Sequence, residues 1–248
     1  MKQTTLGEAR DARSEAKPLE LPDATGLLGV FGGTFDPIHL GHLHAARQVL
    51  DRLGLARLLF VPSGAPPHKP GVQVAPARLR CEWVRRAVAD DERFGVDALE
   101  VERAGPSFSV DTLRTIGARV APQLPVFVVG CDALADMGTW REPEAILELA
   151  HLAVIARRDP GAPDEGTLAA RFPSALAGAL EFDRHGLFAR HRHSDTWVRW
   201  LEIDALPISS TDVRAHLAAG RSVRDLLPAS IHDAVLASGV YARKGARA

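Results

Sequence analysis

The sequence has few of the features that mark secreted, membrane-bound or nucleic-acid-binding proteins. Its 248 residues contain only two cysteines, Cys81 and Cys131, which lie far apart and match no metal-binding spacing. No apolar run approaches the length of a membrane span, and the N-terminus has no apolar leader. Because the formal net charge is -1, a broad basic surface for nucleic acid or anionic lipid is not expected. We therefore expect a cytoplasmic protein with no metal site of its own, no nucleic-acid partner and no membrane contact.

Motifs of several common enzyme classes are missing as well. The glycines of Gly29–Gly33 fit neither the G-x-G-x-x-G fingerprint of dinucleotide-binding folds nor the Walker A pattern. There is no G-x-S-x-G elbow, and neither cysteine has a histidine near it in sequence to act as its base. These absences disfavour a dinucleotide-dependent oxidoreductase and an enzyme that works through a nucleophile–base pair.

The sequence does contain a regular alternation of apolar strand patterns and amphipathic helix patterns. Strands are predicted at residues 27–31, 57–61, 96–101, 126–129, 152–156 and 198–203. Helices are predicted at 41–53, 77–89, 111–120, 142–150, 168–180, 211–219 and 228–238, of which 168–180 lies in the poorly patterned stretch 157–198. This order predicts an α/β fold, a Rossmann-like doubly wound and mostly parallel sheet with helices on both faces.

The folded part is expected to be one domain, at residues 26–243. Residues 1–25 are polar and poor in large apolar side chains, so they are expected to form a flexible N-terminal extension, and 244–248 a C-terminal tail. No internal repeat and no linker divides the rest. Ligands of such sheets bind beyond the carboxyl ends of the strands, so the loops that follow the strands are the places to search.

The first of these loops has the composition of a phosphate site. The first strand ends in Gly32-Gly33, which lets the backbone approach a ligand, and a helical pattern begins near Leu40. A helix N-terminus attracts anions, and His39 and His42 lie three residues apart around it. The alternative is that the two histidines only cap the helix, or bind a metal as an H-x-x-H pair.

A second candidate follows the predicted strand at 57–61. The loop contains Pro66-Pro67-His68-Lys69, and prolines fix φ, so the lysine loses less entropy when it binds. The lysine would supply a positive charge to phosphate oxygens. An exposed proline-rich loop with an incidental cation is the alternative for this stretch taken alone.

A third candidate is Ile208–Arg214, near the C-terminal end. Ser209 and Asp212 have capping-box spacing, which predicts a helix start whose amides and hydroxyls could hold an anion. Arg214 in the first turn opposes the helix dipole unless a polyphosphate neutralises it. A capped helix with an exposed arginine is the alternative.

Two further loops carry aromatic and polar side chains. Gly105–Thr112 and Gly130–Trp140 both follow predicted strands, and a tryptophan after a polar loop can stack on a flat heteroaromatic ring. Asp132 could accept ribose hydroxyl bonds, and Trp140 could equally belong to the core. Three histidines in an arginine-rich stretch lack acidic or cysteine partners and are expected to be solvated; they are His185, His191 and His193.

Together these stretches resemble the bacterial nicotinate-nucleotide adenylyltransferase family of the nucleotidyltransferase superfamily. The resemblance covers residues 27–241 and rests on Gly32–His42, Pro66–Lys69, Arg80, Gly105–Thr112, Gly130–Trp140, Ile208–Arg214, Leu227-Pro228 and Gly239–Tyr241. The first loop and the I-S-S-T stretch are shared across the superfamily. The P-P-H-K, G-P-S-F-S-x-D-T and G-x-D…W stretches narrow the resemblance to this family.

The resemblance implies transfer of AMP from ATP to nicotinate mononucleotide, giving deamido-NAD and pyrophosphate. It implies that the triphosphate is held by His39, His42, Lys69 and Arg214 as the catalytic residues. ATP contacts would come from Gly32, Gly33, Thr34, Phe35, His39, His42, Gly130, Asp132, Ile208, Ser209, Ser210, Thr211 and Arg214. Mononucleotide contacts would come from Thr34, Lys69, Ser107, Phe108, Ser109, Thr112, Trp140 and Arg158. Mg²⁺, the implied cofactor, would be bound mainly through the ATP phosphates.

The sequence departs from the family pattern in ways that leave alternatives open. Phe108-Ser109 stands where Tyr-Thr is frequent, and Arg157-Arg158 precedes Pro160-Gly161 where one arginine is usual. A related adenylyltransferase that uses nicotinamide mononucleotide or phosphopantetheine is the nearest alternative. A catalytically silent nucleotide sensor is the alternative from another class. The oligomeric state, monomer or homo-oligomer, is left open.

Overall fold

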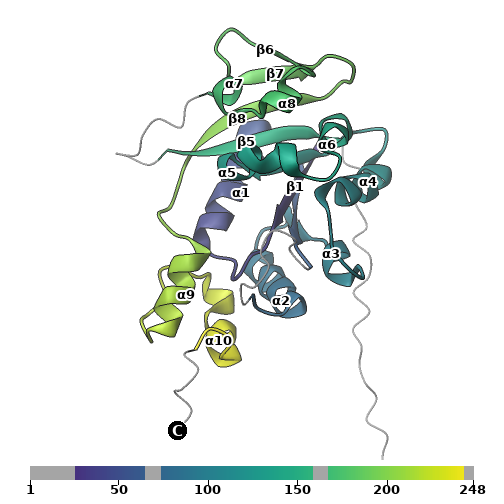
Figure 1. Cartoon of the computed structure of the whole chain (residues 1–248). Helices are drawn as coiled ribbons and strands as arrows, with labels where there is room; N and C mark the ends of the chain where they lie inside the picture. The colour runs from purple at the N-terminus through teal and green to yellow at the C-terminus, as the bar shows by residue number, and fades with distance from the viewer. Residues whose placement is uncertain (1–25, 65–73, 159–166, 243–248) are drawn as a thin grey trace, which may run out of the picture.

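A computed structural model of the chain describes residues 26–64, 74–158 and 167–242 (Figure 1). Its strands are β1 (Leu28–Gly33), β2 (Arg57–Pro62), β3 (Phe94–Val96), β4 (Val126–Gly130), β5 (His151–Arg158), β6 (Leu180–Phe182), β7 (Phe188–His191) and β8 (Trp197–Asp204). They form one sheet in the order β3-β2-β1-β4-β5-β8-β7-β6. Neighbours from β3 to β8 pair in parallel, and β7 and β6 continue the sheet in antiparallel pairing. The predicted mostly parallel sheet is confirmed.

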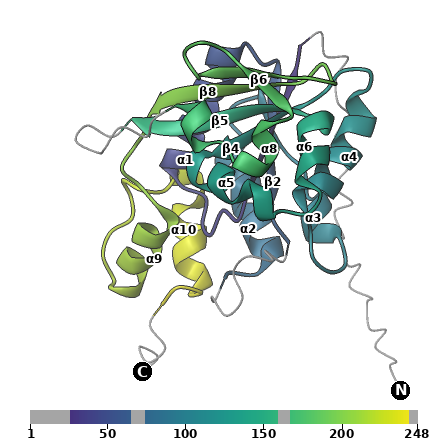
Figure 2. The ribbon, with the colours of Figure 1, turned by 45° about the horizontal axis from the view of Figure 1, so that its top comes forward.

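Helices cover both faces of this sheet (Figure 2). They are α1 (Leu40–Leu53), α2 (Ala77–Val88), α3 (Leu99–Glu102), α4 (Ser109–Val120), α5 (Cys131–Asp136), α6 (Pro143–Leu149), α7 (Leu168–Arg171), α8 (Ser174–Ala177), α9 (Ser210–Ala218) and α10 (Ala229–Ser238). One apolar core contains side chains of α1, α2 and α10, among them Trp83 and Ile231. A second core lies against α4, α5 and α6 and contains Leu113 and Ile146. The sheet is therefore doubly wound, as expected.

The central strand β1 shows why its sequence is a nearly continuous apolar run. Successive side chains of a strand point to opposite faces, and both faces of a central parallel strand are buried. Val30 accordingly packs into the core beside α4, and Phe31 packs into the core beside α1. The run ends at Gly32-Gly33, where the chain leaves the sheet for the first loop.

The predicted strand at 96–101 is wrong beyond its first residue, because β3 lies at Phe94–Val96 and α3 begins at Leu99. The strand β3 ends at Val96, and the Asp97 N–H makes a last bond to the carbonyl of Phe60 at 3.0 Å. The Asp97 carboxylate then accepts the N–H of Leu99 at 3.0 Å, an Asx turn that starts the short helix α3. Local side-chain bonding therefore overrides the apolar pattern of this stretch.

The predicted helix at 168–180 is divided by Pro173. A proline disfavours the helical conformation of the residue before it, and Phe172 is extended, with φ -68° and ψ 137°. Two short helices, α7 and α8, take the place of one long helix, and the antiparallel pair β6–β7 follows them. His185 and His193 are exposed as expected, but His191 ends β7 and is buried, which corrects its predicted solvation.

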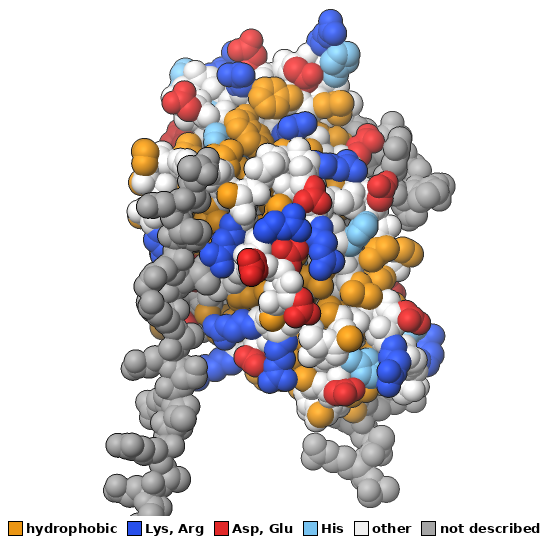
Figure 3. Space-filling model, turned by 180° about the vertical axis from the view of Figure 1, so that it is seen from behind, with side chains coloured by type: hydrophobic (Ala, Val, Ile, Leu, Met, Phe, Trp, Pro, Cys, Tyr) orange, Lys and Arg blue, Asp and Glu red, His pale blue; other side chains and the backbone are white. Residues whose placement is uncertain are grey.

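Within the described ranges, no helix combines the length and apolar character needed to cross a membrane. On the back of the molecule, basic and acidic side chains lie next to one another, with small apolar patches between them (Figure 3). This mixture agrees with the formal net charge of -1.

Candidate active site

The loop after β1 is shaped by Phe35, which turns its ring inward. Phe35 has a positive φ of 47°, is only 2% exposed, and packs edge-on against Phe31 and Phe60. A Cβ on Gly33 would lie 2.8 Å from the Phe35 ring, so only glycine fits above it. The Phe35 ring therefore supports the loop from the core side, and an ATP contact at this residue stays a prediction.

The two predicted histidines lie together at the start of α1. His39 is the N-cap and is buried, and its backbone N–H donates to Nδ1 of His42 at 3.3 Å. The two rings lie one over the other, with centroids 3.7 Å apart. The Leu40 N–H is already bonded to the carbonyl of Leu226 at 2.9 Å, so the side chains carry more of any anion binding here than the sequence predicts.

The start of α9 is built as the Ser209–Asp212 spacing predicts. The Ser209 hydroxyl accepts the Asp212 N–H at 3.1 Å, and the Asp212 carboxylate accepts the Ser209 N–H at 3.2 Å. Bonding to Ser209 holds the pKa of Asp212 below its usual range. The Ser210 hydroxyl donates to the carbonyl of Pro37 at 3.1 Å, which joins α9 to the first loop.

Arg214 is held between these two helix starts. Its guanidinium donates to the carbonyl of Asp36 at 2.8 Å and to the hydroxyl of Thr211 at 3.1 Å. A Cβ on Gly41 would lie 3.3 Å from the carbonyl of Ile208, so the first turns of α1 and α9 are in close contact. Two histidines, an arginine and two helix N-termini therefore converge on one place.

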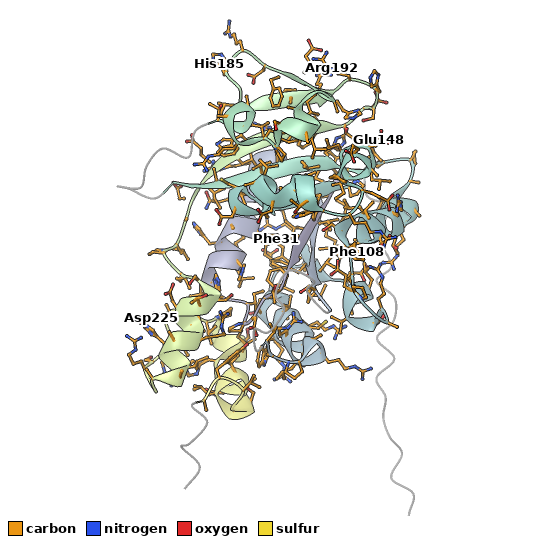
Figure 4. All side chains as sticks on the ribbon, in the orientation of Figure 1. Phe31, Phe108, Glu148, His185, Arg192 and Asp225 are labelled. Atoms are coloured by element: carbon orange, nitrogen blue, oxygen red, sulfur yellow. The ribbon has the colours of Figure 1, made fainter. Side chains whose placement is uncertain are left out.

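A cavity of about 310 Å³ opens beside this cluster, at the carboxyl ends of β1 and β4. Its described lining consists of Val30, Phe31, Gly32, Gly33, Thr34, Ser63, Glu100, Ser107, Phe108, Ser109, Thr112, Phe127, Val128, Val129, Gly130, Ala133, Trp140 and Arg141. Figure 4 labels Phe31 and Phe108, which belong to different elements of this lining. The structure thus brings most predicted mononucleotide residues, and Gly130 with them, to one cavity.

The two aromatic walls of the cavity are fixed by their neighbours. Trp140 is half-buried and meets Phe127 edge-on, with ring centroids 6.4 Å apart. Phe108 is the N-cap of α4, and the guanidinium of Arg141 lies 4.9 Å from the centre of its ring. Since Ser109 is the first residue of α4 and lines the cavity, the positive end of that helix dipole faces the cavity.

Glu100 is a lining residue that the sequence reasoning missed, because it lies in the stretch predicted as a strand. Its carboxylate accepts the hydroxyl of Thr112 at 2.6 Å, and its backbone carbonyl accepts the hydroxyl of Ser107 at 3.4 Å. Burial raises the pKa of Glu100 above its usual range. The Thr112 hydroxyl is therefore already bonded, and the residue acts here as part of the wall.

Arg80 of α2 is buried behind the first loop. Burial lowers its pKa, and nearby Asp36 opposes that shift. Its guanidinium donates to backbone carbonyls of Thr34, Ser63, Gly64 and Ala75. Sequence resemblance pointed to Arg80, and the structure shows that it holds the first loop at Thr34 and the described residues on either side of 65–73.

The remaining predicted residues lie elsewhere or outside the described chain. Lys69 and its proline-rich loop fall at 65–73, outside the described residues, and the side chains of Arg157 and Arg158 at the end of β5 are likewise not described. The prediction of a loop at 130–140 is corrected, because α5 begins directly at Cys131 with the extended Gly130 at its N-cap position. Asp132 lies exposed on α5, outside the described lining of the cavity.

A family model described as cytidylyltransferase-like matches residues 30–216 of the chain. A protein of Thermus thermophilus, named a probable nicotinate-nucleotide adenylyltransferase, is 41% identical over 215 residues, 86% of this chain and 98% of that protein. A protein of Citrifermentans bemidjiense with the same name is 39% identical over 214 residues, 86% of this chain and 97% of its own length.

Solved structures share the fold at much lower identity. Nicotinic acid mononucleotide adenylyltransferase of Plasmodium falciparum, in complex with APC, superimposes with a TM-score of 0.63 at 15% identity, over 87% of this chain and 97% of that one. The same protein complexed with NaAD gives a TM-score of 0.63 at 16% identity. At this identity the likeness supports the fold alone, a Rossmann-like sheet with helices on both faces.

Proposed function

The chain belongs to the nicotinate-nucleotide adenylyltransferase family of cytidylyltransferase-like proteins, and from this we infer its reaction. It transfers AMP from ATP to nicotinate mononucleotide, giving deamido-NAD and pyrophosphate, a step of NAD biosynthesis. One observation carries the assignment of its site: the His39–His42–Arg214 cluster at two helix starts lies beside a cavity with aromatic walls. The cluster suits a triphosphate, and the cavity suits a flat ring.

The chemistry needs placement and charge neutralisation more than it needs a base. An oxygen of the mononucleotide 5′-phosphate attacks the α-phosphorus of ATP and forms one P–O bond. The bond from that phosphorus to the α–β bridging oxygen breaks, and pyrophosphate leaves with the electron pair. Because the attacking oxygen is already anionic, no proton has to be removed, and the rate comes from in-line positioning and charge stabilisation.

We assign to His42 the stabilisation of the negative charge that develops on the phosphates. Its Nδ1 accepts the His39 N–H, so a neutral ring carries its proton on Nε2, and Nε2–H can donate to a phosphate oxygen. The Phe35 ring lies edge-on against His42, with centroids 5.1 Å apart, and fixes the ring from the core side. A donor held in this way needs no reorganisation when the charge appears.

Arg214 and the hydroxyls of Ser210 and Thr211 are assigned to bind the same triphosphate from the N-terminal end of α9. A guanidinium in the first turn of a helix opposes the dipole, and a bound polyphosphate offsets that repulsion. The described residues include no group of three or more acidic, histidine or cysteine side chains arranged to hold a metal ion. Mg²⁺, when bound, would therefore be held by the phosphates and water, and would neutralise part of their charge.

The cavity is assigned to the nicotinate ring of the mononucleotide. Trp140 offers a face for stacking, and backbone N–H groups at the start of α4, near Ser107–Ser109, would meet the carboxylate. Lys69 and one of Arg157 and Arg158 remain proposed contacts on the strength of the family pattern. The cytoplasmic location is also kept as a proposal, supported by two buried cysteines, Cys81 and Cys131, that form no disulfide with each other.

Trp140→Ala tests which half of the site the cavity serves. Ring stacking on an aromatic side chain is worth about 1–3 kcal/mol, so the KM for nicotinate mononucleotide should rise about 5- to 150-fold. The KM for ATP should change much less. Steady-state kinetics with each substrate varied in turn measures both.

The matched control is Trp197→Ala, which removes another half-buried indole. The Trp197 ring stacks on His151, with centroids 4.6 Å apart, and does not line the cavity. It should leave both KM values near those of the wild type. A rise in the ATP KM alone in Trp140→Ala would place the indole in the other half of the site and overturn this assignment.

A further inference from the structure

Tyr241 is the only tyrosine of the sequence, and the reaction described above does not use it. It follows α10, which ends at Gly239 in the left-handed conformation with φ 61°, so the chain turns back toward the first loop. Its ring is half-buried and packs against Trp83 of α2, with centroids 6.0 Å apart. Its hydroxyl donates to Oδ1 of Asp36 at 2.5 Å, across 205 positions of sequence.

The acceptor of this bond, Asp36, lies at the junction of four segments. Its carboxylate is 3% exposed and also accepts the N–H of Ala75 at 3.0 Å, the second described residue after 65–73. Its Oδ2 lies 3.7 Å from the guanidinium of Arg214, which also bonds the Asp36 carbonyl at 2.8 Å. The first loop, the chain before α2, α9 and the C-terminal turn therefore meet at one buried carboxylate.

We propose that Tyr241 is a positioning residue for adenylyl transfer, which acts through Asp36 on Arg214. The phenol hydroxyl and the Ala75 N–H hold Oδ1, so the carboxylate plane is fixed and only Oδ2 faces the guanidinium. Without the phenol, Oδ1 keeps one donor, and the carboxylate is free to turn toward Arg214 and draw it off the phosphates. The inference rests on the proposed function, because it needs Arg214 to hold the triphosphate.

Tyr241→Phe removes the hydroxyl and keeps the ring against Trp83. Because hydrogen bonds to charged groups are among the stronger ones and small misplacements slow transfer, we expect kcat to fall about 5- to 20-fold. The KM values for both substrates should stay within about twofold, since the substrates keep their other contacts. Ser238→Ala is the control, because it removes a hydroxyl of the same turn that bonds the carbonyl of Val235 at 2.7 Å and does not reach Asp36.

A double-mutant cycle separates positioning from a structural role. In an Arg214→Lys background the bidentate holding of the guanidinium is already lost, so Tyr241→Phe should have little further effect on kcat. An equal fall of kcat in both backgrounds would mean that Tyr241 supports the fold in general, and would overturn the proposal. A fall of similar size in Ser238→Ala would overturn it too.

Ionisation of the single tyrosine gives a readout that does not depend on activity. Burial and the bond to Asp36 raise the pKa of Tyr241 far above its ordinary value, so ultraviolet titration should show no phenolate at about pH 10–11 in the folded wild type. Asp36→Asn should move the transition to lower pH.

Titration of the folded wild type at about pH 10, as in an unfolded chain, would show that the bond is not made and would refute the proposal. If the phenol titrates as expected but the wild type transfers no AMP to any mononucleotide, the proposed function fails, and the positioning role fails with it. The two failures are therefore told apart by one spectroscopic and one kinetic measurement.

Discussion

At the residue scale, one hydrogen bond decides which nitrogen of His42 faces a ligand. The His39 N–H occupies Nδ1, so the ring can serve the phosphates only through Nε2. The ring is also fixed by Phe35 and by the neighbouring His39 ring. A donor that is held on three sides is preorganised, and preorganised donors contribute most when charge develops in the transition state.

His42→Ala should therefore leave the fold intact and lower turnover by roughly 10²–10³, as the loss of one preorganised donor does. The control is His44→Ala, two positions further along α1, because residues two apart do not share a helix face. Turnover by pyrophosphate release and folding by circular dichroism would be measured together. Near-normal turnover of a folded His42→Ala protein would contradict the assigned role.

Sequence reasoning identified residues in local motifs and missed those defined by distant contacts. His39, His42, Ser209 and Arg214 are recognised because their spacing places them at helix starts. Other parts of the site depend on partners that lie far along the chain. Glu100 meets Thr112 from α3, a segment that the sequence predicts as a strand, and the partner of Tyr241 lies 205 positions away in the sequence. No local pattern encodes those pairings.

At the element scale, long periodic segments were predicted well, and the wrong predictions fall on short elements. The helices α1, α2 and α10 begin and end within a residue or two of the predicted bounds, because each has an apolar face of regular spacing. In addition, α1 and α10 are each followed by a left-handed glycine. The ends of short elements are decided by single bonds. The side chain of Asp97 ends β3, and Pro173 divides the helix predicted at 168–180. Neither effect can be read from the pattern of apolar residues.

The first residue of β5 is a histidine that makes the free energy of unfolding depend on pH. His151 is buried, stacks on Trp197, and accepts the Trp197 N–H on Nδ1 at 3.3 Å. Burial lowers the pKa of His151 below its ordinary value, so the folded protein binds this proton less readily than the unfolded chain does. Its contribution is present above about pH 6.5 and is lost as the pH falls below that value.

His151→Phe keeps a flat ring against Trp197 and cannot ionise. We expect a lower stability at neutral pH, because the bond from the Trp197 N–H is lost, and a weaker decline of stability between about pH 6.5 and 5. Urea denaturation at a series of pH values measures both. The control is His185→Phe at an exposed histidine, which should show the same fall of the free energy of unfolding toward acid pH as the wild type. If that fall were unchanged in His151→Phe, groups other than His151 would cause it.

At the scale of the whole molecule, the sheet order explains why separate loops form one site. The loops after β1, β2 and β4 leave at the same edge of the sheet and, with the chain before α4, line one cavity. The start of α9 returns to that edge after β8, and Ser210 bonds the first loop. The C-terminal turn closes the arrangement from the side of α2 (Figure 2). The predicted topology was sufficient to bring the loops of the candidate site to one edge of the sheet, but not to give the bonds between them.

A comparison of acceptors measures whether the cavity beside α4 selects an acidic mononucleotide. The kcat/KM values with ATP would be measured for nicotinate mononucleotide, nicotinamide mononucleotide and phosphopantetheine, with dinucleotide and pyrophosphate quantified. Because bonds to a charged group are worth about 1.5–3 kcal/mol, we expect the acid to be preferred over the amide by at least about tenfold, with equal amounts of deamido-NAD and pyrophosphate. Equal use of acid and amide, a preference for phosphopantetheine, or no pyrophosphate release with any acceptor would contradict the account.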